Sequence, residues 1–200
     1  MKQFEEFCEK TQEKLKIYEE TLEKWQKKIN LVSNSTLSNL RNRHVMDSAQ
    51  LYPLITARTK NVIDMGSGAG FPGLVLAILN QNEGQGAWNV HLIESDSRKC
   101  AFIQEVARLT QTNIFLHNCR IEDVHDIKAD VITARALKDV KTLLDYSQEF
   151  LKPDTMCLFL KGQNVDLELE WAAGYYSFLA KKVPSDYEKG FILQITEINK

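Results

Sequence analysis

The stretch VIDMGSGAGFPGLVLAI, from Val62 to Ile78, places four glycines and one proline between two apolar runs. The chain of 200 residues has only nine glycines, so four within such a short stretch need a local reason. A tight strand-to-helix turn needs one or two, whereas several glycines let the backbone adopt positive φ angles and pass close under a ligand. Pro72 suits the first turn of a helix, where its missing N–H is no loss. The stretch therefore predicts a strand, a ligand-binding loop and a helix.

From Asn61 onward, short apolar runs alternate with helical segments. The pattern predicts strands at 61–65, 89–94, 113–118, 129–134 and 156–161, and helices at 72–80, 97–110, 137–151 and 165–176. Strict alternation implies right-handed crossovers and a parallel sheet covered on both faces. The last runs, 177–183 and 190–198, have no helix between them and predict an antiparallel hairpin at one sheet edge. By analogy, this α/β architecture is the Rossmann-like class I S-adenosylmethionine-dependent methyltransferase fold.

The first part of the chain has a different pattern. Apolar or near-apolar positions recur at steps of three or four from Phe4 to Ile29, which indicates one face of an amphipathic helix. The segment NLVSNSTLSN, residues 30–39, breaks this helix, and residues 37–55 predict one or two further helices that end near Pro53. We therefore expect an N-terminal helical extension, residues 1–58, packed on a methyltransferase domain, residues 59–200.

Composition limits the possible partners. A formal net charge of −2 argues against a protein that coats nucleic acid non-specifically, although local basic patches remain possible. The four cysteines are scattered without a C-x-x-C pair, so neither a metal site nor a disulfide framework is indicated. With no long apolar run and a highly charged start, we expect a cytoplasmic protein without a membrane partner. The residues proposed to contact a nucleic-acid substrate are Arg41, Arg43, His44, Lys99 and Arg120.

The class of ligand is decided by charge. GAGFPG, from Gly68 to Gly73, satisfies the dinucleotide fingerprint, and Glu94 has the spacing of an acid that binds ribose hydroxyls in either NAD or S-adenosylmethionine. Asp64 stands just before Gly66, where a carboxylate would repel a pyrophosphate but would favour a cationic sulfonium. This favours the methyl donor, with Asp64, Gly66, Gly68 and Glu94 as its binding residues. An NAD(P)-binding oxidoreductase and a non-catalytic S-adenosylmethionine- or RNA-binding module remain the alternatives.

Several motifs together carry a closer resemblance. In order along the chain they are WQKKINLVS, RHVMDS, DMGSGAGFPGLVLAI, LIESDSRKCAFI, CRIE, ITARAL and LFLKG, which span residues 25–162. This combination resembles the glucose-inhibited division protein B family, also called RsmG. Members of that family are bacterial methyltransferases that modify guanine N7 of 16S ribosomal RNA. The chain departs from the family at CRIE, where relatives often have GRAE, and at Lys189, where some have arginine.

The resemblance implies roles for particular residues. Gly66, Phe71, Ile121, Glu122 and Arg135 would contact the donor. Arg135 and then Lys161 would be the catalytic residues that position the base, while His44 and Asp47 belong to a family motif on the substrate side or supporting the pocket. The partner implied is 16S rRNA within the small ribosomal subunit or its assembly intermediate, and no metal is needed. Because N7 is unprotonated, methyl transfer requires proximity and alignment rather than a general base.

Overall fold

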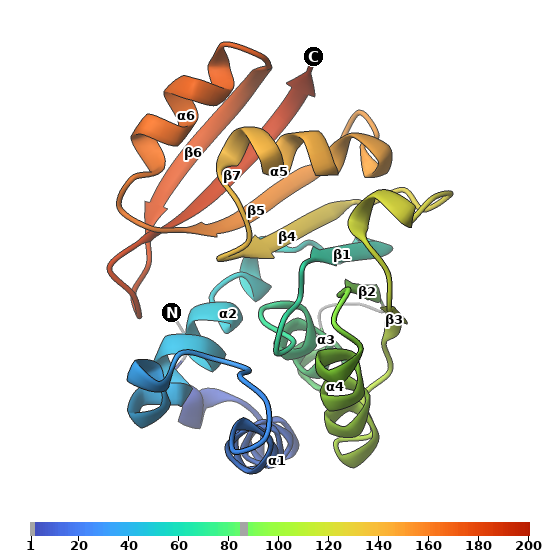
Figure 1. Ribbon diagram of the computed structural model, residues 1–200, viewed down its shortest axis with the longest axis vertical. Coiled ribbons are helices and arrows are strands. Elements are labelled where there is room, and N and C mark those ends of the chain that lie inside the picture. The colour runs from blue at the N-terminus through green and yellow to red at the C-terminus, as the bar shows by residue number, and fades with distance from the viewer. Residues whose placement is uncertain (1–2, 85–87) are drawn as a thin grey trace.

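The computed structural model describes residues 3–84 and 88–200, and it contains one seven-stranded sheet flanked by helices (Figure 1). The strand order is β3-β2-β1-β4-β5-β7-β6, and β1 to β5 are parallel to their neighbours. β7 runs antiparallel to both β5 and β6. The predicted parallel sheet with a terminal hairpin is therefore confirmed, and the strand order changes direction between β1 and β4, since β2 and β3 lie on one side of β1 and β4 and β5 on the other.

The strands form where buried apolar runs predict them. Their bounds are β1 Asn61–Met65, β2 Asn89–Ile93, β3 Phe115–His117, β4 Val131–Arg135, β5 Met156–Lys161, β6 Ser177–Pro184 and β7 Phe191–Asn199. β1 and β5 have the predicted bounds, whereas β3 is shorter than predicted. β3 lies at the sheet edge, where only β2 pairs with it and Phe115 is 52% exposed. With a partner on one side only, fewer of its residues are held in the sheet.

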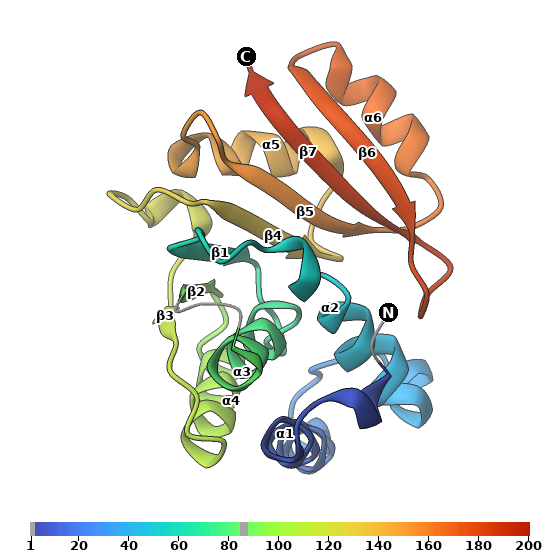
Figure 2. The ribbon, with the colours of Figure 1, turned by 180° about the vertical axis from the view of Figure 1, so that it is seen from behind.

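Helices cover both faces of the sheet (Figures 1 and 2). α5 and α6 lie on one face, and α1 to α4 lie on the other. In the methyltransferase core they are α3 Gly73–Glu83, α4 Ser97–Leu109, α5 Val140–Ser147 with the following turn η6 Gln148–Phe150, and α6 Val165–Ala173. α5 begins later than predicted because the Asp139 side chain accepts a hydrogen bond from Thr142 N and so caps the helix at that point.

The N-terminal extension contains one long helix and several short turns. Their bounds are η1 Phe4–Glu6, α1 Glu9–Gln26, η2 Asn34–Asn39, the π-helical turn η3 Arg41–Met46, α2 Asp47–Ala49 and η4 Tyr52–Leu54. The first strand, β1, then begins at Asn61. The prediction of one continuous helix from Phe4 is wrong, because α1 begins at Glu9. Cys8 N and Thr11 Oγ1 both donate to Glu83 Oε1 of α3, at 2.9 and 2.7 Å, which ties the start of α1 to the core.

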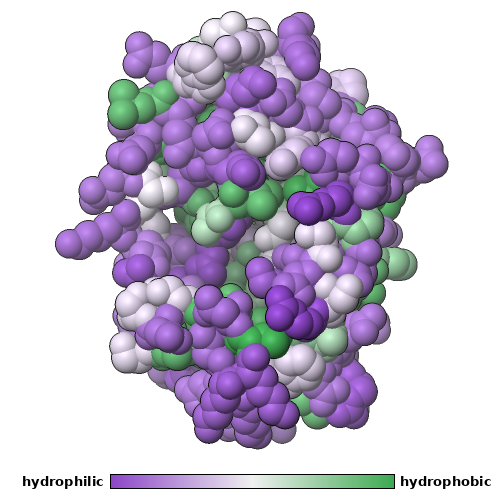
Figure 3. Space-filling model, in the orientation of Figure 1, coloured by the Kyte–Doolittle hydropathy of each residue, from purple (hydrophilic) through white to green (hydrophobic). Residues whose placement is uncertain are grey.

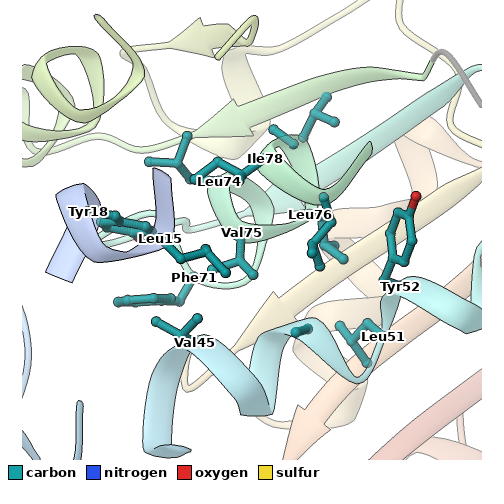
Figure 4. Close-up of a cluster of buried hydrophobic side chains, with 14 of the residues drawn as sticks. Leu15, Tyr18, Val45, Leu51, Tyr52, Phe71, Leu74, Val75, Leu76 and Ile78 are labelled. Atoms are coloured by element: carbon teal, nitrogen blue, oxygen red, sulfur yellow. The ribbon is translucent and has the colours of Figure 1, made fainter. Parts of the chain in front are cut away.

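This extension shares a hydrophobic cluster with the sheet and with α3 and α4. Figure 4 shows Leu15 and Tyr18 of α1 and Val45 of η3 beside Phe71 and the side chains of α3. Leu15, Tyr18 and Val45 are completely buried. Burying such side chains contributes roughly 1.5–3 kcal/mol each, so the extension and the core stabilise one another. The boundary at residue 58 stays a prediction.

Candidate active site

The glycine-rich loop between β1 and α3 has a backbone that other residues cannot easily adopt. Gly66, Gly68 and Gly70 have φ angles of 64°, 58° and 91°. Gly73 has an ordinary φ, but a Cβ there would lie 2.7 Å from Cβ of Asp64. Close packing and left-handed backbone thus explain all four glycines of the opening stretch.

A cavity of about 390 Å³ opens above this loop, at the carboxyl ends of the parallel strands, and we call it the loop cavity. This volume is in the range of small-molecule sites. The predicted donor-binding residues Gly66, Gly68, Phe71, Glu94, Ile121, Glu122 and Arg135 all line it. Lys99 and Arg120 line it as well, so these two cations, predicted to contact substrate, lie at the loop cavity. The complete lining is Leu31, Val32, Gly66, Ser67, Gly68, Ala69, Phe71, Ile93, Glu94, Ser95, Lys99, Cys119, Arg120, Ile121, Glu122, Arg135, Ala136, Leu137, Lys138 and Tyr146.

Glu94 holds the loop and faces the cavity at the same time. Its Oε2 accepts from Gly68 N and its Oε1 accepts from Asp96 N, each at 2.8 Å. An ionised carboxylate has about four lone-pair positions, so these bonds leave two for a ligand diol. The residues present therefore fit S-adenosylmethionine at the position predicted for its ribose.

Asp64, predicted as a donor-binding residue, is not on the wall of the loop cavity, and its part in donor binding stays a prediction. Its side chain is completely buried beneath the loop, and the lining found among the described residues does not include it. Its Oδ1 accepts from Thr133 Oγ1 at 2.8 Å and its Oδ2 accepts from Gly73 N at 3.1 Å. Burial raises the pKa of Asp64 to about 6. Asp64 thus fastens the start of α3 to β1 and β4, and acts on the cavity only through the loop.

A second cavity of about 430 Å³ adjoins the first, and we call it the hairpin cavity. Figure 3 shows the molecule hollowed near the middle of this face, between the part that carries α5 and β5 and the N-terminal helices. The two cavities share Leu31, Val32, Arg135 and Ala136. The remaining lining of the hairpin cavity is Ser33, Thr36, Arg43, His44, Asp47, Leu160, Lys161, Gly162, Ser185, Glu188, Lys189 and Phe191.

Arg135, at the end of β4, lies on the boundary between the cavities. Its Nη1 donates to the carbonyl of Arg43 at 3.0 Å and lies 3.9 Å from Asp47 Oδ2. Its Nη2 lies 2.5 Å from His44 Nδ1, and its guanidinium carbon stands 5.1 Å from the centre of the Phe71 ring. Burial lowers the pKa of Arg135, an effect that Asp47 opposes. The guanidinium still remains charged at neutral pH.

Of the other residues predicted to be catalytic or to contact substrate, Lys161 and Arg43 line the hairpin cavity and Arg41 lies outside it. Lys161 lines the hairpin cavity and donates to the Lys138 carbonyl at 2.7 Å, while its Nζ lies 2.6 Å from Glu168 Oε2. Arg43 lines the same cavity and forms an ion pair with Glu188. Arg41 pairs instead with Glu19 at 2.6 Å, and in the described part of the chain neither cavity includes it. Its contact with RNA stays a prediction.

Comparisons with known proteins agree with this geometry. Residues 11–189 match the family model GidB, rRNA small subunit methyltransferase G. The chain belongs to this family. The rRNA small subunit methyltransferase G of Paramagnetospirillum magneticum is 46% identical over 95% of this chain and 90% of its own. That of Rhodospirillum rubrum is 44% identical over 95% of this chain and 92% of its own.

Solved structures support the fold of this rRNA small subunit methyltransferase G family member. M. jannaschii TYW2 in complex with AdoMet matches with a TM-score of 0.58 at 16% identity, over 86% of this chain and 78% of its own. A mutant of MtNAS in complex with S-adenosylmethionine matches with a TM-score of 0.62 at 13% identity, over 91% and 72%. The predicted class I methyltransferase fold is confirmed. The family gives no support to an oxidoreductase or a non-catalytic module.

The described residues also bear on metal binding and on membrane insertion. Within residues 3–84 and 88–200, no group of three or more His, Cys, Asp and Glu side chains is arranged to hold a metal ion. In the same ranges no helix is long and apolar enough to cross a membrane.

Sequence reasoning missed several residues that shape this methyltransferase site. Tyr18 of α1 donates its hydroxyl to the Ala69 carbonyl in the glycine loop and stacks on Phe71, with ring centres 5.1 Å apart. Thr36 and Glu188 line the hairpin cavity. Tyr18 stood out only as one apolar position of a helical stripe, and nothing in the local sequence marks the other two.

Proposed function

We propose that this protein transfers the methyl group of S-adenosylmethionine to N7 of a guanine in 16S rRNA. The observation that carries the proposal is Arg135, which lies on the wall of both cavities. One cavity has the size and acceptor groups for the donor, and the other opens beside it. Membership of the rRNA small subunit methyltransferase G family supports the class of substrate.

The residues of the loop cavity would hold the donor, which supplies an electrophilic methyl group on sulfur. Glu94 would accept hydrogen bonds from the ribose hydroxyls with its two remaining lone-pair positions. Gly66, Phe71, Ile121 and Glu122 would surround the rest of the molecule, since all of them line the cavity. The buried carboxylate of Asp64 supports this arrangement by holding the start of α3.

The hairpin cavity would take the unstacked guanine. RNA loops expose such bases more readily than duplex does. N7 has a free lone pair, so the reaction needs alignment and no proton removal. Arg135, and secondly Lys161, would position the base or its phosphate. Arg43, Lys99 and Arg120 lie at the two cavities, where they would contact RNA.

The net charge of −2 favours a structured acceptor over RNA in general, because non-specific affinity depends on many phosphate contacts. We therefore place the reaction on the small ribosomal subunit or its assembly intermediate, in the cytoplasm. In the first experiment, purified protein is incubated with radiolabelled S-adenosylmethionine and small subunits from a strain that lacks this gene. Label on N7 of a single 16S guanine is expected. Donor binding without label would point to another acceptor.

A further inference from the structure

The hydrogen-bond donors and acceptors around His44 define which ring nitrogen carries its proton. His44 lies in η3, and its ring stands between Arg135 of β4 and Thr36 of η2. Arg135 Nη2 is 2.5 Å from Nδ1, and Thr36 Oγ1 is 2.8 Å from Nε2. A guanidinium only donates hydrogen bonds, so Nδ1 must accept and carries no proton. The ring proton therefore lies on Nε2, which donates to the Thr36 hydroxyl.

Burial and neighbouring charge keep this ring neutral. His44 is 7% exposed, and burial, followed by the charges of Arg135 and Arg43, lowers its pKa to about 3. The other charged groups on the walls of this cavity are Asp47 next to η3, Lys161 of β5, and Glu188 and Lys189 of the β6–β7 turn. Since Nδ1 already accepts from Arg135, His44 is not available as a general base.

We infer that His44 is a positioning residue: its Nδ1 holds the guanidinium of Arg135 on the boundary between the loop cavity and the hairpin cavity, and Thr36 holds the ring. This rests on the proposed function. Arg135 Nη1 also donates to the carbonyl of Arg43, so η3 holds both terminal nitrogens. Two of the five N–H donors are thereby used, and three are left for other acceptors.

A fixed orientation of the Arg135 guanidinium would favour methylation at N7. The commonest contact of arginine with guanine is bidentate, to O6 and N7 together. Such a contact would occupy the lone pair that must attack the methyl group. Arg135 cannot rotate freely while both terminal nitrogens are anchored, and we expect it to donate to O6 or to a phosphate and leave N7 free. The N-terminal extension thus takes part in catalysis by orienting a residue of the core.

Two substitutions separate the bonds of His44. In His44→Asn the amide oxygen occupies the place of Nδ1, which keeps the acceptor for Arg135 and loses the bond to Thr36. In His44→Gln the amide reaches the place of Nε2, which keeps Thr36 and loses Arg135. We expect His44→Gln to lower kcat about 100-fold, the scale of an orientation loss. His44→Asn should stay within about 10-fold of the wild type, on the same argument. Donor Kd and melting temperature should be close to wild type in both variants.

The assay uses the full chain with small subunits, and the exposed His125→Gln is the control for removing a histidine. Wild-type kcat in His44→Gln, or an equal loss in both His44 variants, would overturn the inference. Nitrogen-15 spectra of the ligand-free protein provide a readout that does not need activity. A neutral ring with its proton on Nε2, unchanged from pH 5 to 8, is expected. A proton on Nδ1, or titration in that range, contradicts the arrangement, whereas absence of label with wild-type enzyme contradicts the proposed function instead.

Discussion

The two cavities of this methyltransferase are built in different ways. The loop cavity is built around the ends of β1, β2 and β4 and around one continuous loop, residues 66–71, in which three glycines have positive φ angles. Residues from other segments, among them Leu31, Ile121 and Tyr146, complete its walls. The hairpin cavity is assembled from side chains that are distant in sequence, among them Thr36, His44, Lys161 and Glu188. Backbone geometry encoded in one motif would, in the proposed function, serve the methyl donor. Side chains from separate segments would, in the proposed function, hold the RNA substrate.

The largest expected effect tests the backbone of the loop cavity. In Gly70→Ala the new Cβ would lie 2.7 Å from Tyr18 Oη and 3.0 Å from Leu74 Cβ, at a φ of 91°. We expect loss of donor binding and a decrease of about 3 kcal/mol in the free energy of unfolding. Calorimetric binding of S-adenosylhomocysteine and urea unfolding measure the two effects.

Gly84→Ala is the matched control, because Gly84 also has a positive φ but, chain neighbours aside, no atom of residues 3–84 and 88–200 lies within 4 Å of the new Cβ. Its cost should be about 1 kcal/mol, with unchanged donor binding. If Gly70→Ala bound the donor with wild-type affinity, the backbone of the glycine loop would not determine the shape of the loop cavity.

The next effect concerns the acid beneath the loop. Because burial raises the pKa of Asp64 from 3.8 to about 6, the folded protein binds this proton more tightly than the unfolded chain does. The stabilisation of the folded protein by this proton is fully present below the pKa that Asp64 has in the unfolded chain, and it is lost as the pH rises through about 6. From pH 4 to 7, the wild type should lose up to about 3 kcal/mol relative to Asp64→Asn. Urea unfolding at several pH values measures this. The control Asp154→Asn, at an exposed position, should keep the wild-type pH dependence. If the free energy of unfolding of Asp64→Asn changed with pH as that of the wild type does, the prediction would be contradicted.

A smaller effect is expected where the N-terminal extension reaches the loop cavity. Tyr18→Phe leaves the Ala69 carbonyl without its hydroxyl donor, which should cost about 1–2 kcal/mol of unfolding free energy. Donor affinity should decrease, because Ala69 lines the loop cavity. Thermal unfolding with and without S-adenosylhomocysteine is the measurement, and Tyr175→Phe, at a 48% exposed position, is the control. If Tyr18→Phe and Tyr175→Phe were equally stable, the hydrogen bond from Tyr18 to Ala69 would not stabilise the glycine loop.

The smallest effect is expected for one ion pair at the hairpin cavity. The ion pair of Arg43 with Glu188 is partly exposed to solvent, so its coupling energy should be below about 1 kcal/mol. A double-mutant cycle with Arg43→Met and Glu188→Met measures it, and donor affinity should remain that of the wild type. A coupling above about 2 kcal/mol, or a weakened donor, would mean that the two cavities are not built independently.

Much of this structure could be predicted from local patterns. The bounds of β1 and β5, the order of strands and helices, and the loop residues Gly66 to Phe71 follow from apolar runs and glycine spacing, since each signal is contained in a short segment. Asp64 was recognised near the end of β1, but its burial beneath the loop could not be predicted, because spacing does not show which side of the backbone a side chain faces. The ion pair of Arg41 could not be predicted for a similar reason, since its partner Glu19 belongs to another helix.

The sequence by itself determined the fold class, the glycine-rich loop and, through its motifs, the family, because these depend on residues close together in the chain. Only the tertiary structure decided how the hairpin cavity is assembled. Thr36, His44 and Arg135 meet because the N-terminal extension packs on the same face of the sheet as α3. Their roles depend on burial and on which atom donates to which. Those properties arise only when distant segments pack together and exclude water.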